Sequence, residues 1–279
     1  MDLKYDLEIV TPNTVANTTG IGRGNAGAIS LGNFTIVIDS TIYAKTALIF
    51  RQNLEKHFNL PIKFLIFTHY HADHIFGIGP FRDIIKISSE QMITNMNSKS
   101  IKEQYNIRVK QFPKEDPLAE GVEFKLPDIG FHDKLIIHDE DLFIEILHLG
   151  GHTSGTSIVY FPYEKVIFAG DLIFANYFPY AGDPTCNPEK YIKALQIMKN
   201  LNAEFIIPGH GKVLKGKNSL DIYIDFFKEF RKSIKNAIED NIPLEKIDIP
   251  HKFEVFRDDM KKSSIEHWYN FFKKSEDLS

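Results

Sequence analysis

Thr68-His69-Tyr70-His71-Ala72-Asp73-His74 places three histidines and an aspartate within six residues, 69–74. The whole chain has only 11 histidines in 279 residues, so chance is a poor explanation of this density. Histidine is the commonest metal ligand among side chains, and carboxylates are suitable companions for divalent ions. Crowded imidazoles without a metal would need a separate partner for every ring nitrogen. The stretch therefore indicates a metal site and not a surface turn with incidental histidines.

The residues before this run indicate where it lies in the fold. Residues 62–67, IKFLIF, follow a proline, are mostly apolar and are rich in β-formers, which is typical of a buried strand. Open α/β sheets carry their chemistry at the carboxyl ends of strands. His69 and His71 are two residues apart and point the same way in an extended backbone, whereas Asp73 and His74 are adjacent and diverge. One loop can thus supply two neighbouring metal positions.

The composition limits the class of protein. Hydrophobic residues make up 43% and charged residues 25%, which is ordinary for a soluble globular protein. The net charge of −4, without a basic tail, gives no sign of nucleic-acid binding. No signal peptide or membrane span is indicated, and the single cysteine, Cys186, excludes an intrachain disulfide and is interpreted as a buried bystander. We expect a cytoplasmic protein with a small-molecule substrate and no nucleic-acid or membrane partner; a homodimer stays open.

Hydrophobic patterning predicts alternating strands and helices. Strands are expected at 6–11, 26–31, 34–38, 62–67, 84–87, 134–138, 142–149, 157–161, 166–169 and 205–207. Helices are expected at 43–58, 89–111, 188–201, 218–240 and 263–274. Asp39-Ser40-Thr41 is predicted to provide the N-cap of the first helix, residues 12–25 are predicted to be a polar loop, and the proline-bearing stretch 112–133 receives no assignment.

Three later positions repeat the pattern of a metal-binding side chain beside a strand. His152 stands in the glycine-rich turn GGHTSG, Asp171 follows an apolar strand, and His210 stands in PGHG. Each position alone has a simpler explanation, such as a glycine turn for His152 or a helix N-cap for Asp171. Three such positions in one chain favour a shared metal site.

Taken together, these residues resemble the metallo-β-lactamase superfamily of metallohydrolases. The resemblance rests on His69-x-His71-x-Asp73-His74, followed in order by His152, Asp171 and His210, and it spans about residues 20–215. It implies an α/β fold, a four-layer αββα sandwich with the metal site at one sheet edge. We therefore predict a domain at 1–216 and a helical C-terminal extension at 217–279, packed on the domain but not covered by the resemblance.

The resemblance also implies a ligand set for two divalent ions, with zinc expected and iron or manganese as alternatives. The first ion would be held by His69, His71 and His152, the second by Asp73, His74 and His210, and Asp171 would bridge the two. Three neutral imidazoles suit zinc. A bridging hydroxide would attack the substrate, and Asp73 would be the catalytic residue that orients it or passes on its proton.

Two positions favour one branch of this superfamily. Zinc-dependent β-lactamases of the best-known class carry Cys in place of Asp171 and Arg in place of His74, so this chain is closer to hydroxyacylglutathione hydrolases and lactonases. We expect a zinc-dependent hydrolase of an ester, lactone, thioester or amide, with weak β-lactamase side activity. The alternatives are a mononuclear iron enzyme similar to persulfide dioxygenases, using His69, His152 and Asp171, and a phosphodiesterase or nuclease on the same fold.

Aromatic residues beside the motifs are the candidates for substrate binding. They are Tyr70, Phe76, Tyr177 and Tyr180. An aromatic, uncharged lining favours an uncharged substrate face, although packing onto the core explains the same residues equally well. The aromatic residues of the C-terminal helices must also be buried somewhere: against the sandwich, over the site as a lid, or in a dimer contact.

Overall fold

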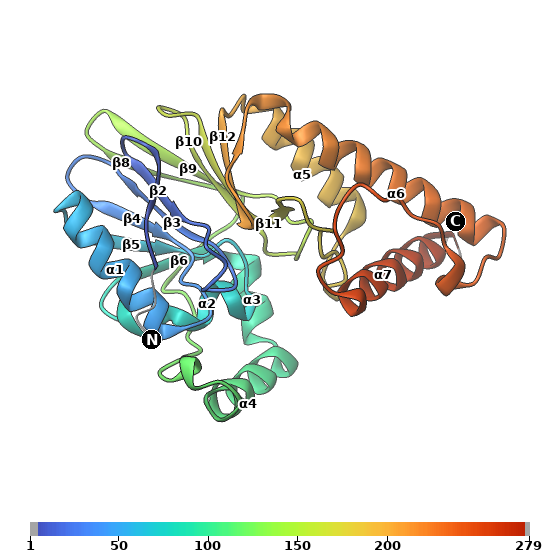
Figure 1. Ribbon diagram of the computed structural model, residues 1–279, viewed down its shortest axis with the longest axis horizontal. Coiled ribbons are helices and arrows are strands. Elements are labelled where there is room, and N and C mark those ends of the chain that lie inside the picture. Colours follow the sequence, from blue (N-terminus) through green and yellow to red (C-terminus); the bar gives the residue numbers. More distant parts are fainter. Residues whose placement is uncertain (1–4, 277–279) are drawn as a thin grey trace.

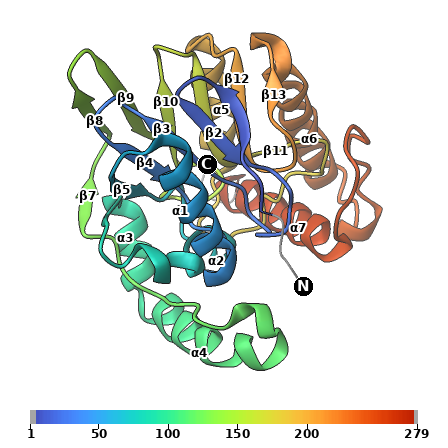
Figure 2. The ribbon, with the colours of Figure 1, turned by 60° about the vertical axis from the view of Figure 1, so that its left-hand side comes forward.

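The computed structural model describes residues 5–276 as two face-to-face β-sheets with helices on both outer faces (Figure 1). Figure 2 shows α1 and α3 beside the first sheet, and α5 and α6 beyond the second. Within the described residues, no helix is long and apolar enough to cross a membrane. The architecture confirms the expected mixed α/β fold.

The first sheet has seven strands that follow one another in chain order. They are β1 (Glu8–Thr11), β2 (Thr14–Asn17), β3 (Ala26–Ser30), β4 (Thr35–Ile38), β5 (Ile62–Ile66), β6 (Ile85–Ser89) and β7 (Ile129–Phe131). Strands β1 to β4 pair antiparallel, including the predicted hairpin of β3 and β4, whereas β4 to β7 pair parallel. The parallel half places the carboxyl ends of β4 and β5 next to each other.

The second sheet has six strands in the order β13-β12-β11-β10-β9-β8. They are β8 (Lys134–Asp139), β9 (Leu142–His148), β10 (Ser157–Phe161), β11 (Val166–Phe174), β12 (Phe205–His210) and β13 (Leu214–Lys215). All neighbours are antiparallel except β11 and β12, which run parallel. The predicted hairpin of residues 134–138 and 142–149 is confirmed as β8 and β9.

Helices cover both outer faces and form the C-terminal part of the chain. The α-helices are α1 (Ala44–Phe58), α2 (Ala72–Ile75), α3 (Glu90–Asn97), α4 (Lys99–Glu115), α5 (Pro188–Asn200), α6 (Asp221–Glu239) and α7 (Asp258–Glu276). Short 3₁₀ helices are η1 (Phe76–Phe81), η2 (Pro117–Ala119), η3 (Lys217–Leu220) and η4 (Leu244–Lys246).

Three hydrophobic clusters separate the four layers. Between the sheets, buried side chains such as Ile36 and Ile146 face each other. A second cluster, including Phe50 of α1, lies on the outer face of the first sheet. A third, including Tyr191 of α5 and Trp268 of α7, lies on the outer face of the second. A helix or sheet buries one face against its neighbour, so three clusters require four layers, and the expected αββα sandwich is confirmed.

The C-terminal helices share the outer cluster of the second sheet. The Phe227 ring of α6 lies 4.2 Å from the Tyr191 ring and 5.4 Å from the Trp268 ring, measured between centroids. Trp268 itself has no exposed surface. Aromatic rings at these separations interact favourably beyond the area they bury. The extension is thus continuous with the sandwich core, while the boundary between residues 216 and 217 stays a prediction.

Local structure differs from the prediction in the N-terminal half of the chain. The single helix expected at 89–111 is two helices, because Ser98 has an extended ψ of 140° that ends α3 and begins α4. The expected loop at 12–25 contains β2, whose four residues are all buried. Its Thr- and Asn-bearing sequence carries no apolar alternation, so pairing with β1 and β3 and not local preference makes it a strand.

Candidate metal centre

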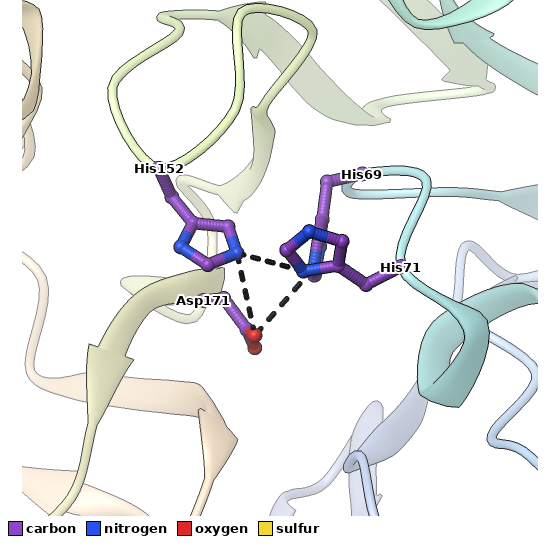
Figure 3. Close-up of side chains that lie close together, drawn as sticks. All are labelled: His69, His71, His152 and Asp171. Carbon is purple, nitrogen blue, oxygen red and sulfur yellow. Dashed lines mark hydrogen bonds and ion pairs between the residues drawn. The ribbon is translucent and has the colours of Figure 1, made fainter. Parts of the chain in front are cut away.

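The structure brings together all seven predicted metal ligands in two groups. Within each group the candidate ligand atoms lie within 4.8 Å of one another. The first group is His69, His71, His152 and Asp171, and the second is Asp73, His74 and His210. Figure 3 shows His152 approaching from the β9–β10 loop, His69 and His71 from the loop after β5, and Asp171 from β11.

The loop after β5 divides its ligands by changing conformation in its middle. His71 is extended, with φ −63° and ψ 146°, and α2 begins at the next residue. His69 and His71 therefore leave an extended chain on one side, whereas Asp73 and His74 belong to the first helical turn. The change from strand-like to helical backbone explains why adjacent motif residues serve different groups.

The sequence predicted that Asp171 follows the end of a strand. In the structure, Asp171 instead occupies an irregular part within β11. The pairing of β11 with β12 shifts register on both sides of Gly170, and β11 then continues to Phe174. Gly170 has φ +52°, and a Cβ there would lie 2.8 Å from the Thr68 side chain. Only glycine combines a positive φ with so close a neighbour without strain. The irregularity at this glycine turns Asp171 toward the histidines.

His71 and His152 each use one ring nitrogen in a hydrogen bond to an acceptor outside the cluster of candidate ligands, and this fixes which nitrogen carries the proton. His71 donates from Nε2 to Asp183 Oδ2 at 2.9 Å, and His152 donates from Nδ1 to the carbonyl of Tyr180 at 2.9 Å. The remaining nitrogens, His71 Nδ1 and His152 Nε2, lie 3.0 Å apart. Without a metal, a proton on His71 joins them in a hydrogen bond, since burial lowers the pKa of His71 but hydrogen bonding to Asp183 raises it above the ordinary value. A metal ion bound by both nitrogens would displace that proton.

Asp39 fixes the tautomers of two further histidines. Thr68 Oγ1 donates to Asp39 Oδ2 at 2.8 Å and therefore accepts from His69 Nδ1 at 3.0 Å. His74 Nδ1 donates to the same carboxylate oxygen at 2.8 Å. The Nε2 atoms of both rings consequently face inward, where a metal ion could bind them. The N-cap role predicted for Asp39-Ser40-Thr41 is wrong: Tyr43 precedes α1 as N-cap, without a side-chain cap hydrogen bond.

Unpartnered buried atoms show that the residues fit a cation. Among the described side chains, seven buried nitrogen or oxygen atoms lack a hydrogen-bond partner, and three of them are His69 Nε2, His74 Nε2 and Asp171 Oδ1. Such atoms are rare in folded proteins because leaving them unpaired costs about 1–3 kcal/mol each. All three point into the same cluster, and His74 Nε2 lies 3.1 Å from Asp171 Oδ1. One divalent ion at His69 and a second at His74 and Asp171 Oδ1 would satisfy them.

The charge balance of the centre also favours a cation. Burial lowers the pKa of His69 well below its ordinary value and that of His152 to about 4, which keeps both rings neutral. Burial acts the same way on His74, but the Asp171 and Asp39 carboxylates overcome it and raise the pKa of His74 well above its ordinary value. Burial would raise the pKa of Asp171, yet the surrounding imidazoles hold it well below the usual range. The centre thus keeps its carboxylates charged and attracts positive charge.

Asp183 belongs to the centre and was not among the residues that the sequence indicated. Its side chain is 5% exposed, and its Oδ2 accepts from Tyr70 as well as from His71. The backbone N–H and hydroxyl of Thr185 both donate to its Oδ1. The surrounding sequence, GDPT, looks like an ordinary turn, so only the tertiary structure shows that this carboxylate reaches His71.

The four candidate substrate residues are placed differently from one another. Tyr180 is half-buried, with its ring centroid 6.0 Å from that of His71. Tyr177 is also half-buried and packs edge-on against the exposed Phe256. Tyr70 is 4% exposed, and its hydroxyl is occupied by Asp183. Phe76 is fully buried in the core cluster beneath the loop and presents no surface to a substrate.

Comparisons with known proteins agree with this geometry. The sequence model of the family described as "Metallo-beta-lactamase superfamily" matches residues 19–210. The chain is 26% identical over 199 residues to "Beta-lactamase-like protein 2 homolog" of Caenorhabditis elegans, which covers 70% of this chain and 58% of the relative. It is 28% identical over 119 residues to "Hydroxyacylglutathione hydrolase" of Pelagibacter ubique (strain HTCC1062), covering 42% and 38%. The match spans less than two thirds of either relative.

Solved structures show the same fold. A metallo-β-lactamase from Pontibacter korlensis superposes with a TM-score of 0.63 at 16% identity, covering 80% of this chain and 98% of that one. The sec-alkylsulfatase Pisa1 from Pseudomonas sp. superposes with a TM-score of 0.71 at 14% identity, covering 95% and 50%. Coverage of 95% leaves out only about 14 of the 279 residues, so the second likeness includes most of the C-terminal extension.

Proposed function

The chain belongs to the metallo-β-lactamase superfamily, and we propose that it is a dinuclear metal-dependent hydrolase of a small-molecule ester, lactone, thioester or amide. The observation that carries this proposal is the position of Asp171 between the two groups. Its Oδ2 lies 3.5 Å from Nε2 of both His69 and His152. Its Oδ1 lies 3.1 Å from Nε2 of His74 and 3.3 Å from Nε2 of His210. One carboxylate oxygen for each group is the arrangement that a bridging ligand needs.

The donor set supports zinc as the metal. The first group offers three imidazole nitrogens, and the second offers two imidazoles and the Asp73 carboxylate. Zinc prefers such nitrogen and oxygen ligands, with a place left for water in catalytic sites. Two zinc ions, when bound, would lower the pKa of water and polarise the scissile carbonyl. Iron or manganese would suit the same donors less selectively.

The protein's own contribution to the reaction is to place charge and move protons. Asp73 Oδ2 lies 3.4 Å from His210 Nε2, and the Asp73 side chain is 25% exposed. A partly exposed carboxylate beside the reacting centre can orient the attacking water, accept its proton and return a proton to the leaving group. We assign that role to Asp73. The buried Asp171 keeps its charge and serves only as a ligand.

The proposed class of substrate follows from the flanking residues and from the curated relatives. Tyr177 and Tyr180 lie on the segment that joins the candidate ligand Asp171 to Asp183, and both retain exposed surface. Aromatic faces of this kind bind uncharged or apolar groups. The name of the Pelagibacter relative places thioesters among the substrates to be tried.

One experiment tests the metal content and the reaction together. Purified protein is analysed for metal, assayed against lactones, thioesters, β-lactams, alkyl sulfates and phosphodiesters, treated with a chelator and reloaded with zinc. We expect about two ions per chain, loss of hydrolysis on chelation and its return with zinc. An active preparation with far fewer than two ions would contradict the dinuclear proposal. Oxygen uptake with a persulfide by iron-loaded protein would instead support the oxygenase alternative.

A further inference from the structure

One short segment, residues 180–186, orients two of the three histidines of the first metal group. The carbonyl of Tyr180 accepts from His152 Nδ1, and Asp183 accepts from His71 Nε2, both at 2.9 Å. The two contacts are three residues apart on a segment without regular secondary structure. The ring orientations of His71 and His152 therefore depend on the shape of this segment.

Helix α7 holds the other side of the same segment. The backbone N–H of Ala181 donates to Ser264 Oγ at 2.9 Å, and His267 Nε2 donates to the carbonyl of Cys186 at 2.8 Å. Ser264 is fully buried. Gly182 packs so closely on Ser263 that a Cβ at position 182 would collide with the serine side chain. The C-terminal extension thus fixes the path of the segment that reaches the metal centre.

Hydrogen bonds to its carboxylate fix Asp183 within the segment. Its carboxylate accepts from four donors: the Tyr70 hydroxyl at 2.6 Å, His71 Nε2 at 2.9 Å, the Thr185 N–H at 2.8 Å and the Thr185 hydroxyl at 2.6 Å. Charge-assisted hydrogen bonds of this number leave a buried carboxylate little freedom to move. A carboxylate behind a ligating histidine fixes its tautomer and raises its basicity.

We propose that Asp183 is the positioning residue that makes His71 a ligand through Nδ1, on a segment that α7 holds at Ala181 and Cys186. The inference rests on the proposed function, because it assumes that the first group binds a metal. The two groups also differ in which residues orient their histidines, because Asp183 contacts a histidine of the first group. His74 of the second group is oriented by Asp39, at the end of β4 in the other sheet, and has no contact with the 180–186 segment among its described hydrogen bonds. Loss of Asp183 should therefore weaken one metal position and spare the other.

The test uses the full chain with four substitutions. Asp183→Leu removes every acceptor, and Asp183→Asn keeps an acceptor oxygen without the charge. Asp39→Leu removes the support of His74 in the second group and, through Thr68, that of His69 in the first. Asp248→Asn, on a side chain that is 94% exposed, is the matched control. The measurements are the two zinc dissociation constants, by chelator competition, and the His71 tautomer in metal-free protein, by ¹⁵N imidazole NMR.

We expect Asp183→Leu to weaken one zinc constant by about 10–100-fold and to leave the other near the wild-type value. Asp39→Leu should weaken both constants, because Asp39 supports a histidine in each group, and Asp248→Asn should weaken neither. The His71 ring should keep its Nε2–H tautomer in wild type and in Asp183→Asn, and lose it in Asp183→Leu. If Asp183→Leu does not fold, Asp183→Asn provides the test: we expect its zinc affinity to fall several-fold at one position and to stay unchanged at the other.

The outcomes separate the two proposals. Wild-type protein that binds no zinc would overturn the proposed function, while the His71 tautomer would still report on the role of Asp183. Folded Asp183 variants with both zinc constants and the tautomer unchanged would overturn the positioning role and leave the hydrolase proposal standing. Equal weakening of both zinc positions would also overturn it, because a merely structural residue would act in that way.

Discussion

His71 Nδ1 and His152 Nε2 lie 3.0 Å apart, and each ring donates the proton of its other nitrogen to an acceptor outside the pair. The two histidines are 81 residues apart in the chain, so the meeting of these two nitrogens is a product of the fold. Two bare acceptors this close repel each other, so either a proton or a metal ion must lie between them. Metal binding at this pair would therefore displace a proton.

Metal removal should lower the stability of the protein. A ligand that binds only the native state stabilises it by about 2.7 kcal/mol at a concentration 100 times its dissociation constant, so zinc at that level should raise Tm by roughly 5–10 °C over the chelated protein. Calorimetry with and without zinc checks this. Magnesium is the control ion, since it prefers oxygen ligands. An unchanged Tm on adding zinc would contradict a bound metal.

Asp73→Ala should nearly abolish hydrolysis while the fold survives. Asp73 is partly exposed and lies at the start of α2, so its removal leaves no buried cavity. We expect a fall in kcat of about 10²–10⁴-fold, the usual contribution of a positioned acid or base, and a change in Tm within a few degrees. Asp248→Ala, at an exposed carboxylate, should keep wild-type activity. Near-wild-type turnover in Asp73→Ala would refute the assigned role.

Gly209→Ala should displace the carboxylate that faces both groups. A Cβ at position 209 would collide with Asp171 Oδ1 and lie 2.9 Å from the Asp171 nitrogen. Gly216→Ala is the matched control: its φ of +89° makes alanine strained, but nothing lies within 4 Å. Both variants should lose stability, by roughly 1 kcal/mol or more, and only Gly209→Ala should lose metal. Equal zinc content in the two variants would argue against this role of Gly209.

Trp268→Ala should destabilise the whole protein and not only its C-terminal helices. Trp268 has no exposed surface and lies in the cluster that also contains Tyr191 of α5. Removing a fully buried aromatic ring costs about 3–5 kcal/mol. The control is Phe256→Ala, at a ring that is 73% exposed, which should change the free energy of unfolding by about 0.5 kcal/mol or less. A separate early transition confined to α6 and α7 would show that the extension folds independently.

Cys186 should be unreactive in the native protein. The thiol is 4% exposed, and burial raises its pKa far above the ordinary value, so the thiol stays protonated at neutral and mildly alkaline pH. Because the thiolate is the reactive form, a thiol reagent at pH 8 should label native protein very slowly and should label one thiol per chain in guanidinium. Rapid labelling of the native protein would show that the segment around Cys186 opens.

Much of the fold could be predicted because its signals are local. The β3–β4 hairpin carries its own turn at Gly32-Asn33, and the strand before His69 carries its own apolar run. The failures occurred where tertiary contacts overrule local preference. β2 is a strand because two neighbours pair with it, and β11 continues past Gly170 because β12 lies beside it. Asp39 supports His74 and not α1 because α2 brings that ring within reach.

The sequence by itself indicated the seven candidate ligands and, through the family resemblance, their division between two ions. Only the tertiary structure decided what orients them. Asp171 turns one oxygen to each group, and Asp183 and Asp39 fix the histidines from opposite sides. Those relations join segments far apart in the chain, and residue type alone carries no information on which distant segment will meet a given ring. Orientation of the ligands is thus a property of packing, whereas their chemistry is a property of the sequence.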